Sequence, residues 1–152
     1  MARRGSLEKG AAQAVLAVDV GNTTTSLGIV EDGALFATWS LTTPERMTAD
    51  EARVAALSFL AATDGAPEVG DAIVASVVPG LTDAWVSAAN ALCGRRPLVV
   101  GPGLKTGVRM RYNDPGELGA DRVADLAAAK AAYEPPLIVV DLGTTTNFEV
   151  VD

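Results

Sequence analysis

The stretch "VDVGNTTTSLGIV", residues 18–30, decides the fold of this chain, and it nearly recurs as "VDLGTTTNFEVV" at residues 140–151. In both copies an apolar strand runs into an Asp-x-Gly turn that threonines follow. Glycine lets successive backbone amides converge on an anion, and threonine hydroxyls add further donors. The stretch therefore predicts a turn that holds phosphate, and its recurrence predicts a pair of such turns.

The aspartates of these turns, Asp19 and Asp141, conflict with phosphate unless a cation lies between them. Magnesium resolves the conflict, because it binds carboxylate and phosphate oxygens and keeps waters around itself. A single Asp-x-Gly turn is equally typical of an ordinary strand end. The duplication after two equivalent strands favours a metal-nucleotide site.

The composition restricts the chemistry that this chain can perform. It has 152 residues, of which 49% are hydrophobic and 20% charged, as in one soluble domain. A net charge of −7 excludes a basic surface for nucleic acid. There is no histidine, and Cys93 is the single cysteine, so zinc sites and disulfides within the chain are excluded. Carboxylates and hydroxyls must carry any catalysis.

The N-terminal residues 1–13 are expected to form a flexible tail. Their basic start is followed by an apolar run that Asp19 interrupts, so the central segment of a secretory signal is missing. No run of about 18 uncharged apolar residues occurs, so no membrane span is expected. These features indicate a cytoplasmic protein.

Hydrophobic patterning predicts a mixed α/β sheet covered by helices. Three short strands over residues 14–20, 26–31 and 35–41 are expected to form an antiparallel meander. Thr48 and Glu51 have the spacing of a capping box and predict a helix start. The apolar face of that helix is expected to consist of Val54, Leu57, Leu60 and Ala61.

Strands and helices alternate in the rest of the chain. Strands are expected at residues 72–80, 97–100, 137–140 and 147–151, and an Ala-rich helix at residues 120–133. A second helix is expected to bury the stripe Leu81, Trp85, Ala88 and Leu92. Asp125 is interpreted as a solvated residue on the Ala-rich helix.

Seven short motifs make the chain resemble type III pantothenate kinases, which catalyse the first step of coenzyme A biosynthesis. They are "DVGNTTT", "TADE", "ASVVP", "VGPGLKTG", "RYNDP", "GADR" and "DLGTTT", in the order and approximate spacing of that family. The resemblance covers about residues 14–152. It implies an RNase H-like, actin-like ATPase fold whose duplicated halves hold nucleotide between two Asp-x-Gly turns. Residues 14–135 would form the first half, and residues 136–152 the first strands of the second.

The resemblance also implies the residues that bind nucleotide and cations. Asp19 would hold Mg²⁺ through water, and Asp141 a monovalent cation, K⁺ or NH₄⁺. Contacts to ATP are implied for Asp19, Val20, Gly21, Asn22, Thr23, Thr24, Thr25, Ser26 and Thr144.

The substrate pantothenate is implied to bind at Tyr112, Gly119, Ala120, Asp121 and Arg122. Asp121 would accept the proton of the attacking hydroxyl. The residues themselves support part of this, because the first turn of a helix offers free N–H groups to an anion, and arginine pairs with carboxylates. An acid is also common in the first turn of a helix for electrostatic reasons alone.

The family continues well beyond the second turn, whereas this sequence ends at Asp152. Members are implied to be homodimers. Two functions therefore stay open at this stage: ATP-dependent phosphorylation of pantothenate, and a non-catalytic remnant that binds nucleotide or dimerises. A kinase of the same superfamily that acts on acetate or a sugar is disfavoured, because "GADR" belongs to the pantothenate branch.

Overall fold

A five-stranded sheet forms the centre of the computed structural model, which describes residues 13–101, 104–108, 111, 118–143 and 146–152. Its strands are β1 (Ala14–Val20), β2 (Thr24–Glu31), β3 (Ala34–Thr42), β4 (Val69–Ser76) and β5 (Leu98–Val99), in the order β3-β2-β1-β4-β5. The first three strands pair antiparallel, and β4 and β5 continue the sheet in parallel with β1. The expected meander and the RNase H-like mixed sheet are confirmed.

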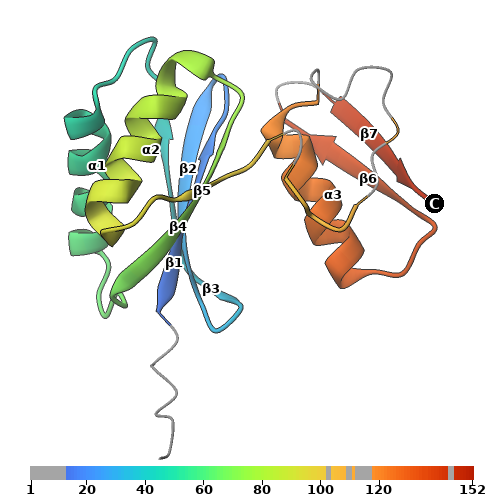
Figure 1. The fold of residues 1–152 in the computed structure, drawn as a ribbon, viewed down its shortest axis with the longest axis horizontal. Coiled ribbons are helices and arrows are strands. Elements are labelled where there is room, and N and C mark those ends of the chain that lie inside the picture. The colour runs from blue at the N-terminus through green and yellow to red at the C-terminus, as the bar shows by residue number, and fades with distance from the viewer. Residues whose placement is uncertain (1–12, 102–103, 109–110, 112–117, 144–145) are drawn as a thin grey trace, which may run out of the picture.

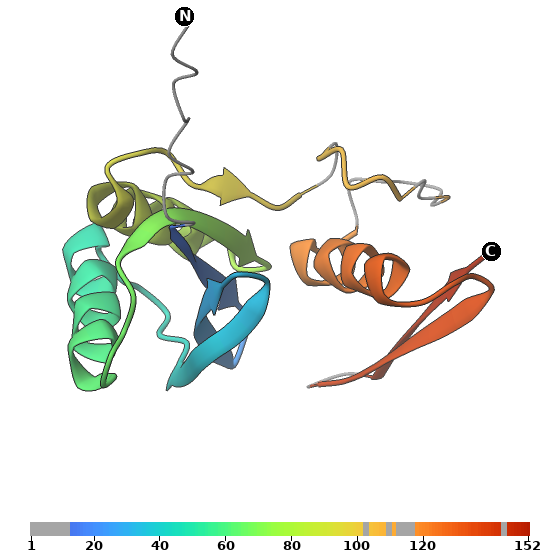
Figure 2. The same ribbon diagram turned by 90° about the horizontal axis from the view of Figure 1, so that it is seen from below.

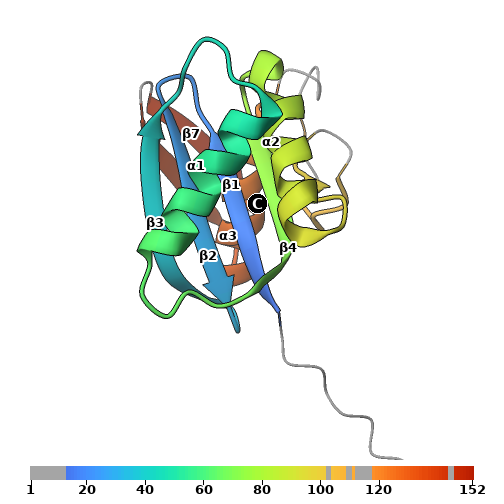
Figure 3. The ribbon, with the colours of Figure 1, turned by 90° about the vertical axis from the view of Figure 1, so that its left-hand side faces the viewer.

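Helices cover both faces of this sheet (Figures 1 and 3). The helices α1 (Ala49–Ala62) and α2 (Pro79–Cys93) lie on one face. On the other side lies α3 (Ala120–Ala132), together with a separate antiparallel hairpin of β6 (Leu137–Leu142) and β7 (Thr146–Val151) (Figures 1 and 2). The sheet therefore has one face toward α1 and α2 and one face toward α3.

The main core lies between the sheet and the helices α1 and α2. Leu16, Val18 and Val20 of β1 pack there with Leu81 and Trp85 of α2, each at most 2% exposed. The expected stripe of α2 is thus confirmed. No helix of the described residues is long and apolar enough to span a bilayer.

The predicted apolar face of α1 is wrong. Val54 is 62% and Leu57 43% exposed, whereas the small residues Ala52 and Ala56 are buried. Because α1 packs directly against α2, alanines let the two backbones approach, and the larger side chains point outward. Phe59 contributes the one large contact, a stacked ring pair with Trp39 at 5.6 Å between centroids.

Local signals fix the helix starts. Thr48 and Glu51 form the expected reciprocal capping box at α1. Pro79 follows β4 and occupies the first turn of α2. Its missing N–H is harmless there, because the first N–H groups of a helix have no partner within the helix. The strand expected over residues 72–80 is therefore shorter at its end, because the chain already turns into α2.

The β6–β7 hairpin has two different faces, because side chains alternate along each strand. Its inner face carries Asp141, Asn147 and Glu149, and the last of these is only 3% exposed. Its outer face consists of apolar side chains that are 49–79% exposed: Ile138, Val140, Leu142, Phe148 and Val150. This outer face is uncovered in the described chain.

Candidate functional site

A cavity of about 590 Å³ opens between the α3 face of the sheet and the hairpin. Strands β1 and β4 are parallel, so their carboxyl ends meet at one edge of the sheet, where the cavity lies. Its polar lining comes from β1, β2 and β3, from the turn between β1 and β2, from α3 and from the hairpin: Asp19, Asn22, Ser26, Thr38, Asp121, Asp125, Asp141 and Asn147.

The alternation of side chains decides which residues of the first turn reach the cavity. Asp19 faces Ser26 across β1 and β2, and both line it. Val20 faces Thr25 on the opposite side of the sheet, where both are fully buried. Gly21 and Asn22 also line the cavity, whereas the exposed Thr23 and Thr24 do not. Among residues 19–26, the residues that line the cavity are thus Asp19, Gly21, Asn22 and Ser26.

Gly21 is required for a different reason than the sequence suggests. Its backbone is not left-handed; instead, a Cβ at this position would lie 2.9 Å from the carbonyl oxygen of Thr24. The amide N–H of Gly21 donates to that same oxygen at 3.0 Å. Glycine therefore permits a close approach between the two sides of the turn.

The second turn faces the same cavity. Asp141, Gly143 and Asn147 line it, and Asn147 Nδ2 donates to Asp141 Oδ2 at 3.3 Å. Thr144, to which an ATP contact was assigned, lies outside the described residues. The two Asp-x-Gly turns thus share one cavity although more than a hundred residues separate them in sequence.

The first turn of α3 brings Asp121 to this cavity. Its Oδ1 accepts a hydrogen bond from the backbone N–H of Arg122 at 2.8 Å. The carboxylate lies over Gly119, where a Cβ would come within 2.3 Å of Asp121 Oδ1 and 3.2 Å of Val77 Cγ1. Ala120 is 5% exposed and packs inside a small cluster of its own with Val123. Glycine at position 119 therefore makes room for the Asp121 carboxylate.

Replacing Gly119 by Ala is expected to move the Asp121 carboxylate while leaving the fold intact, because a side-chain oxygen can yield where backbone could not. We expect the rate of any reaction that depends on the Asp121 carboxylate to fall at least 10-fold, with a change in melting temperature of less than a few degrees. Steady-state kinetics and thermal unfolding of the same preparation test this. An unchanged rate would show that the position of the carboxylate over Gly119 is unimportant.

Four carboxylates face the cavity and repel one another. Burial raises the pKa of Asp19, and the charges of Asp121, Asp125 and Asp141 raise it further. Burial also raises the pKa of Asp125, with added repulsion from Asp141, Asp121 and Glu149. A cation in the cavity would relieve this repulsion.

The donor set fits a cation that brings other ligands with it. No three carboxylates of the described residues lie close enough to enclose a metal ion. Magnesium does not need such a cage, because it retains waters and takes phosphate oxygens beside one or two carboxylates. Asp19 and Asp141 both line the cavity, each from one of the two Asp-x-Gly turns.

Asp125 was interpreted as solvated, and this is wrong. It is half-buried and lines the cavity one helical turn after Asp121, on the same face of α3. The spacing of four between two acids on one helix is the signal in the sequence that would have identified it.

Replacing Asp125 by Asn is expected to raise the melting temperature at pH 7. Because the pKa of Asp125 is raised in the folded state, its ionised form costs stability at neutral pH. The advantage of the variant should shrink as the pH falls through the raised pKa and vanish below the ordinary value of 3.8, where Asp125 is protonated in both the folded and the unfolded chain. Calorimetry at several pH values measures this, and a lower melting temperature at pH 7 would contradict it.

Arg122 is not among the residues that line the cavity. Its Nε donates to Glu149 Oε1 on β7, and the Arg122 side chain is 27% exposed while that of Glu149 is 1% exposed. Glu149 Oε2 has no hydrogen-bond partner among the described residues. No motif in the sequence marks Glu149. Tyr112, another expected substrate residue, lies outside the described residues.

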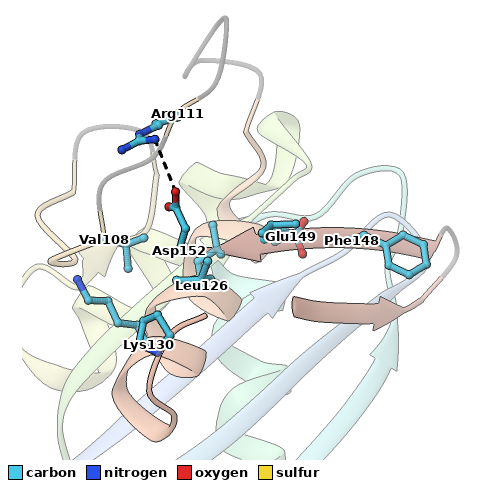
Figure 4. Close-up of a pocket in the computed structure, with 10 residues that line it drawn as sticks. Val108, Arg111, Leu126, Lys130, Phe148, Glu149 and Asp152 are labelled. Carbon is cyan, nitrogen blue, oxygen red and sulfur yellow. Dashed lines mark ion pairs between the residues drawn. The ribbon is translucent and has the colours of Figure 1, made fainter. Parts of the chain in front are cut away.

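A second cavity of about 440 Å³ lies on the far side of α3 (Figure 4). Its lining carries two positive and two negative side chains, Arg111, Lys130, Glu149 and Asp152, and Arg111 pairs with Asp152 at 3.6 Å. Neither Asp-x-Gly turn reaches it. The first cavity is therefore the candidate site.

The match to a family model decides the assignment. The model described as "Type III pantothenate kinase" matches residues 15–152. The chain belongs to the type III pantothenate kinase family. The suspected resemblance is confirmed.

Two bacterial type III pantothenate kinases illustrate the relationship. That of Bifidobacterium animalis subsp. lactis is 40% identical over 139 residues, which cover 91% of this chain and 55% of the relative. That of Listeria welshimeri is 37% identical over 139 residues, covering 91% and 54%. The chain thus spans about half the length of the curated relatives that it matches.

Two solved structures show a distant likeness. An inorganic polyphosphate/ATP-glucomannokinase from Arthrobacter gives a TM-score of 0.49 at 20% identity, covering 91% of this chain and 58% of that one. The RuvC structure of Thermus thermophilus gives 0.42 at 21% identity, covering 78% of each chain.

Proposed function

We propose that this chain carries the catalytic half of a kinase that transfers the γ-phosphoryl group of ATP to pantothenate. The single observation that carries the proposal is the cavity that Asp19, Asp121 and Asp141 share. Membership of the type III pantothenate kinase family names the substrates. A homodimer in the cytoplasm is part of the same proposal.

The residues of the first turn would hold the phosphates of ATP. Gly21, Asn22 and Ser26 line the cavity, and the amides of the first two and the hydroxyl of the third would contact the phosphates. Asp19 would bind Mg²⁺ through water, and Asp141 a monovalent cation. These ions would neutralise charge on the transferred phosphoryl group. The raised pKa of Asp19 supports a cation beside it, because a neighbouring positive charge would offset the repulsion.

Asp121 would accept the proton of the pantothenate hydroxyl as that oxygen attacks phosphorus. Its Oδ1 already accepts the N–H of Arg122, which fixes the carboxylate toward the cavity. Phosphoryl transfer needs positioning and charge neutralisation more than covalent help, so one base suffices and no histidine is required.

Pantothenate would bind beside the start of α3. Gly119, Ala120 and Tyr112 would contact it, and Arg122 would pair with its carboxylate. The Nε of Arg122 also donates to Glu149 Oε1 on β7.

The second candidate function is a non-catalytic module that binds nucleotide or dimerises. It rests on the same cavity, without a catalytic role for Asp121. It predicts that Mg-ATP raises the melting temperature without any turnover.

Turnover by the purified 152-residue chain separates the two functions. We expect ATP-dependent formation of phosphopantothenate, measured by mass spectrometry, and stabilisation by Mg-ATP. The same assay on this chain fused to the C-terminal remainder of the Bifidobacterium relative serves as the comparison. Stabilisation without turnover in the short chain, and turnover in the fusion, would favour the non-catalytic module. If neither protein forms product, the kinase proposal fails.

A further inference from the structure

Thr43 lies directly after β3 and makes three hydrogen bonds to the first Asp-x-Gly turn and the strand that follows it, although no motif in the sequence includes this residue. Its hydroxyl donates to the carbonyl oxygen of Gly21 at 2.7 Å. Its backbone N–H donates to the carbonyl oxygen of Thr23 at 2.9 Å. The hydroxyls of Thr43 and Thr25 lie 2.9 Å apart. One residue therefore holds the turn from the face opposite the cavity.

The direction of these bonds follows from the number of protons. A threonine hydroxyl has one proton, and Thr43 gives it to Gly21. Thr25 must then donate to the oxygen of Thr43. Thr25 is fully buried, so its hydroxyl braces Thr43 instead of contacting a ligand.

The bond to Gly21 determines where the next amide points. In a planar trans peptide, the C=O of one residue and the N–H of the next point in opposite directions. Because Thr43 holds the Gly21 carbonyl on its own side, the N–H of Asn22 is directed to the other side. Both Gly21 and Asn22 line the cavity on that side.

We infer that Thr43 is a positioning residue that aims the backbone N–H of Asn22 at a phosphate group of ATP. This rests on the proposed function, because it takes ATP as the ligand of the cavity. The amide carries a partial positive charge, and a prealigned donor costs no reorganisation when the anion binds.

Substitutions at Thr43 test the inference. Thr43→Val removes the hydroxyl at nearly constant shape and keeps the backbone bond to Thr23. We expect it to weaken Mg-ATP binding about 10-fold, with the KM for pantothenate unchanged in the fusion protein. Thr43→Ser keeps the hydroxyl and should restore affinity. Thr42→Val changes an exposed neighbouring hydroxyl and serves as the matched control, with unchanged affinity expected.

A second readout observes the amide itself. In ¹H–¹⁵N spectra of the wild-type chain, adding Mg-ATP or tripolyphosphate should shift the Asn22 resonance, and Thr43→Val should reduce that shift. Wild-type affinity in Thr43→Val would overturn the inference, as would equal losses for ATP and pantothenate. If Thr43→Val does not fold, an Asn22 resonance that stays in place in the wild type would overturn it.

The failure of the inference and that of the proposed function are distinguishable. If the chain binds Mg-ATP through Asn22 but transfers no phosphoryl group, the inference about Thr43 holds and the kinase proposal fails. If the Thr43→Val variant turns over at the wild-type rate, only the inference about Thr43 fails.

Discussion

Replacing Asp121 by Asn is expected to lower the rate of pantothenate phosphorylation by about 10²–10⁴-fold. Asparagine keeps the size of the side chain and its bond from the Arg122 N–H, but it cannot take the hydroxyl proton. Binding of Mg-ATP should persist or become tighter, because one of four repelling carboxylates loses its charge. Steady-state kinetics with ATP and pantothenate, together with calorimetric titration of Mg-ATP, measure both effects.

The control for this variant is Asp83→Asn, which removes an exposed carboxylate on α2, outside the cavity. It should leave the rate unchanged. An Asp121→Asn enzyme that phosphorylates pantothenate at an undiminished rate would eliminate Asp121 as the base and leave its place at the start of α3 as a structural preference for acids.

The largest loss of stability is expected from Arg122→Met. The Glu149 carboxylate is only 1% exposed, and Arg122 Nε is its bonding partner in the described chain. Removing one member of such a buried pair leaves a charge without compensation, which costs about 3–5 kcal/mol. Because Arg122 lies on α3 and Glu149 on β7, the loss should loosen the hairpin. Urea unfolding measures the free energy of unfolding. Hydrogen exchange of the β6–β7 amides shows whether the loss of stability lies in the hairpin.

A double variant distinguishes charge from packing. Arg122→Met combined with Glu149→Met replaces the buried pair by apolar side chains of similar volume, and this is often neutral or stabilising. We expect the double variant to regain most of the lost stability while losing affinity for pantothenate. A double variant as unstable as Arg122→Met alone would show that the unpaired charge is not the cause.

Much of the fold follows from local patterns in the sequence. The three N-terminal strands are expected at residues 14–20, 26–31 and 35–41, and they occupy residues 14–20, 24–31 and 34–42. The capping box at Thr48 and the apolar stripe of α2 are equally local signals. The buried face of α1 was not predictable from hydrophobicity, because the contact with α2 selects small alanines over the larger Val54 and Leu57.

The candidate site was predictable where its residues repeat a motif. The two Asp-x-Gly turns predict Asp19 and Asp141, and the "GADR" motif predicts Asp121. Thr43 and Glu149 carry no such signal, because each acts through a tertiary contact, to Gly21 and to Arg122, that spans more than twenty residues of sequence. Contacts of this kind depend on how elements pack, and a single sequence does not reveal their partners.

The exposed apolar outer face of the β6–β7 hairpin is expected to lower the solubility of this chain. Apolar surface that meets water drives molecules together, and sulfate or phosphate salts strengthen that attraction by being excluded from protein surfaces. Precipitation should therefore begin at lower ammonium sulfate than a net charge of −7 alone would suggest. Charged residues placed at Leu142 and Val150, the two most exposed positions, would raise solubility without touching the cavity.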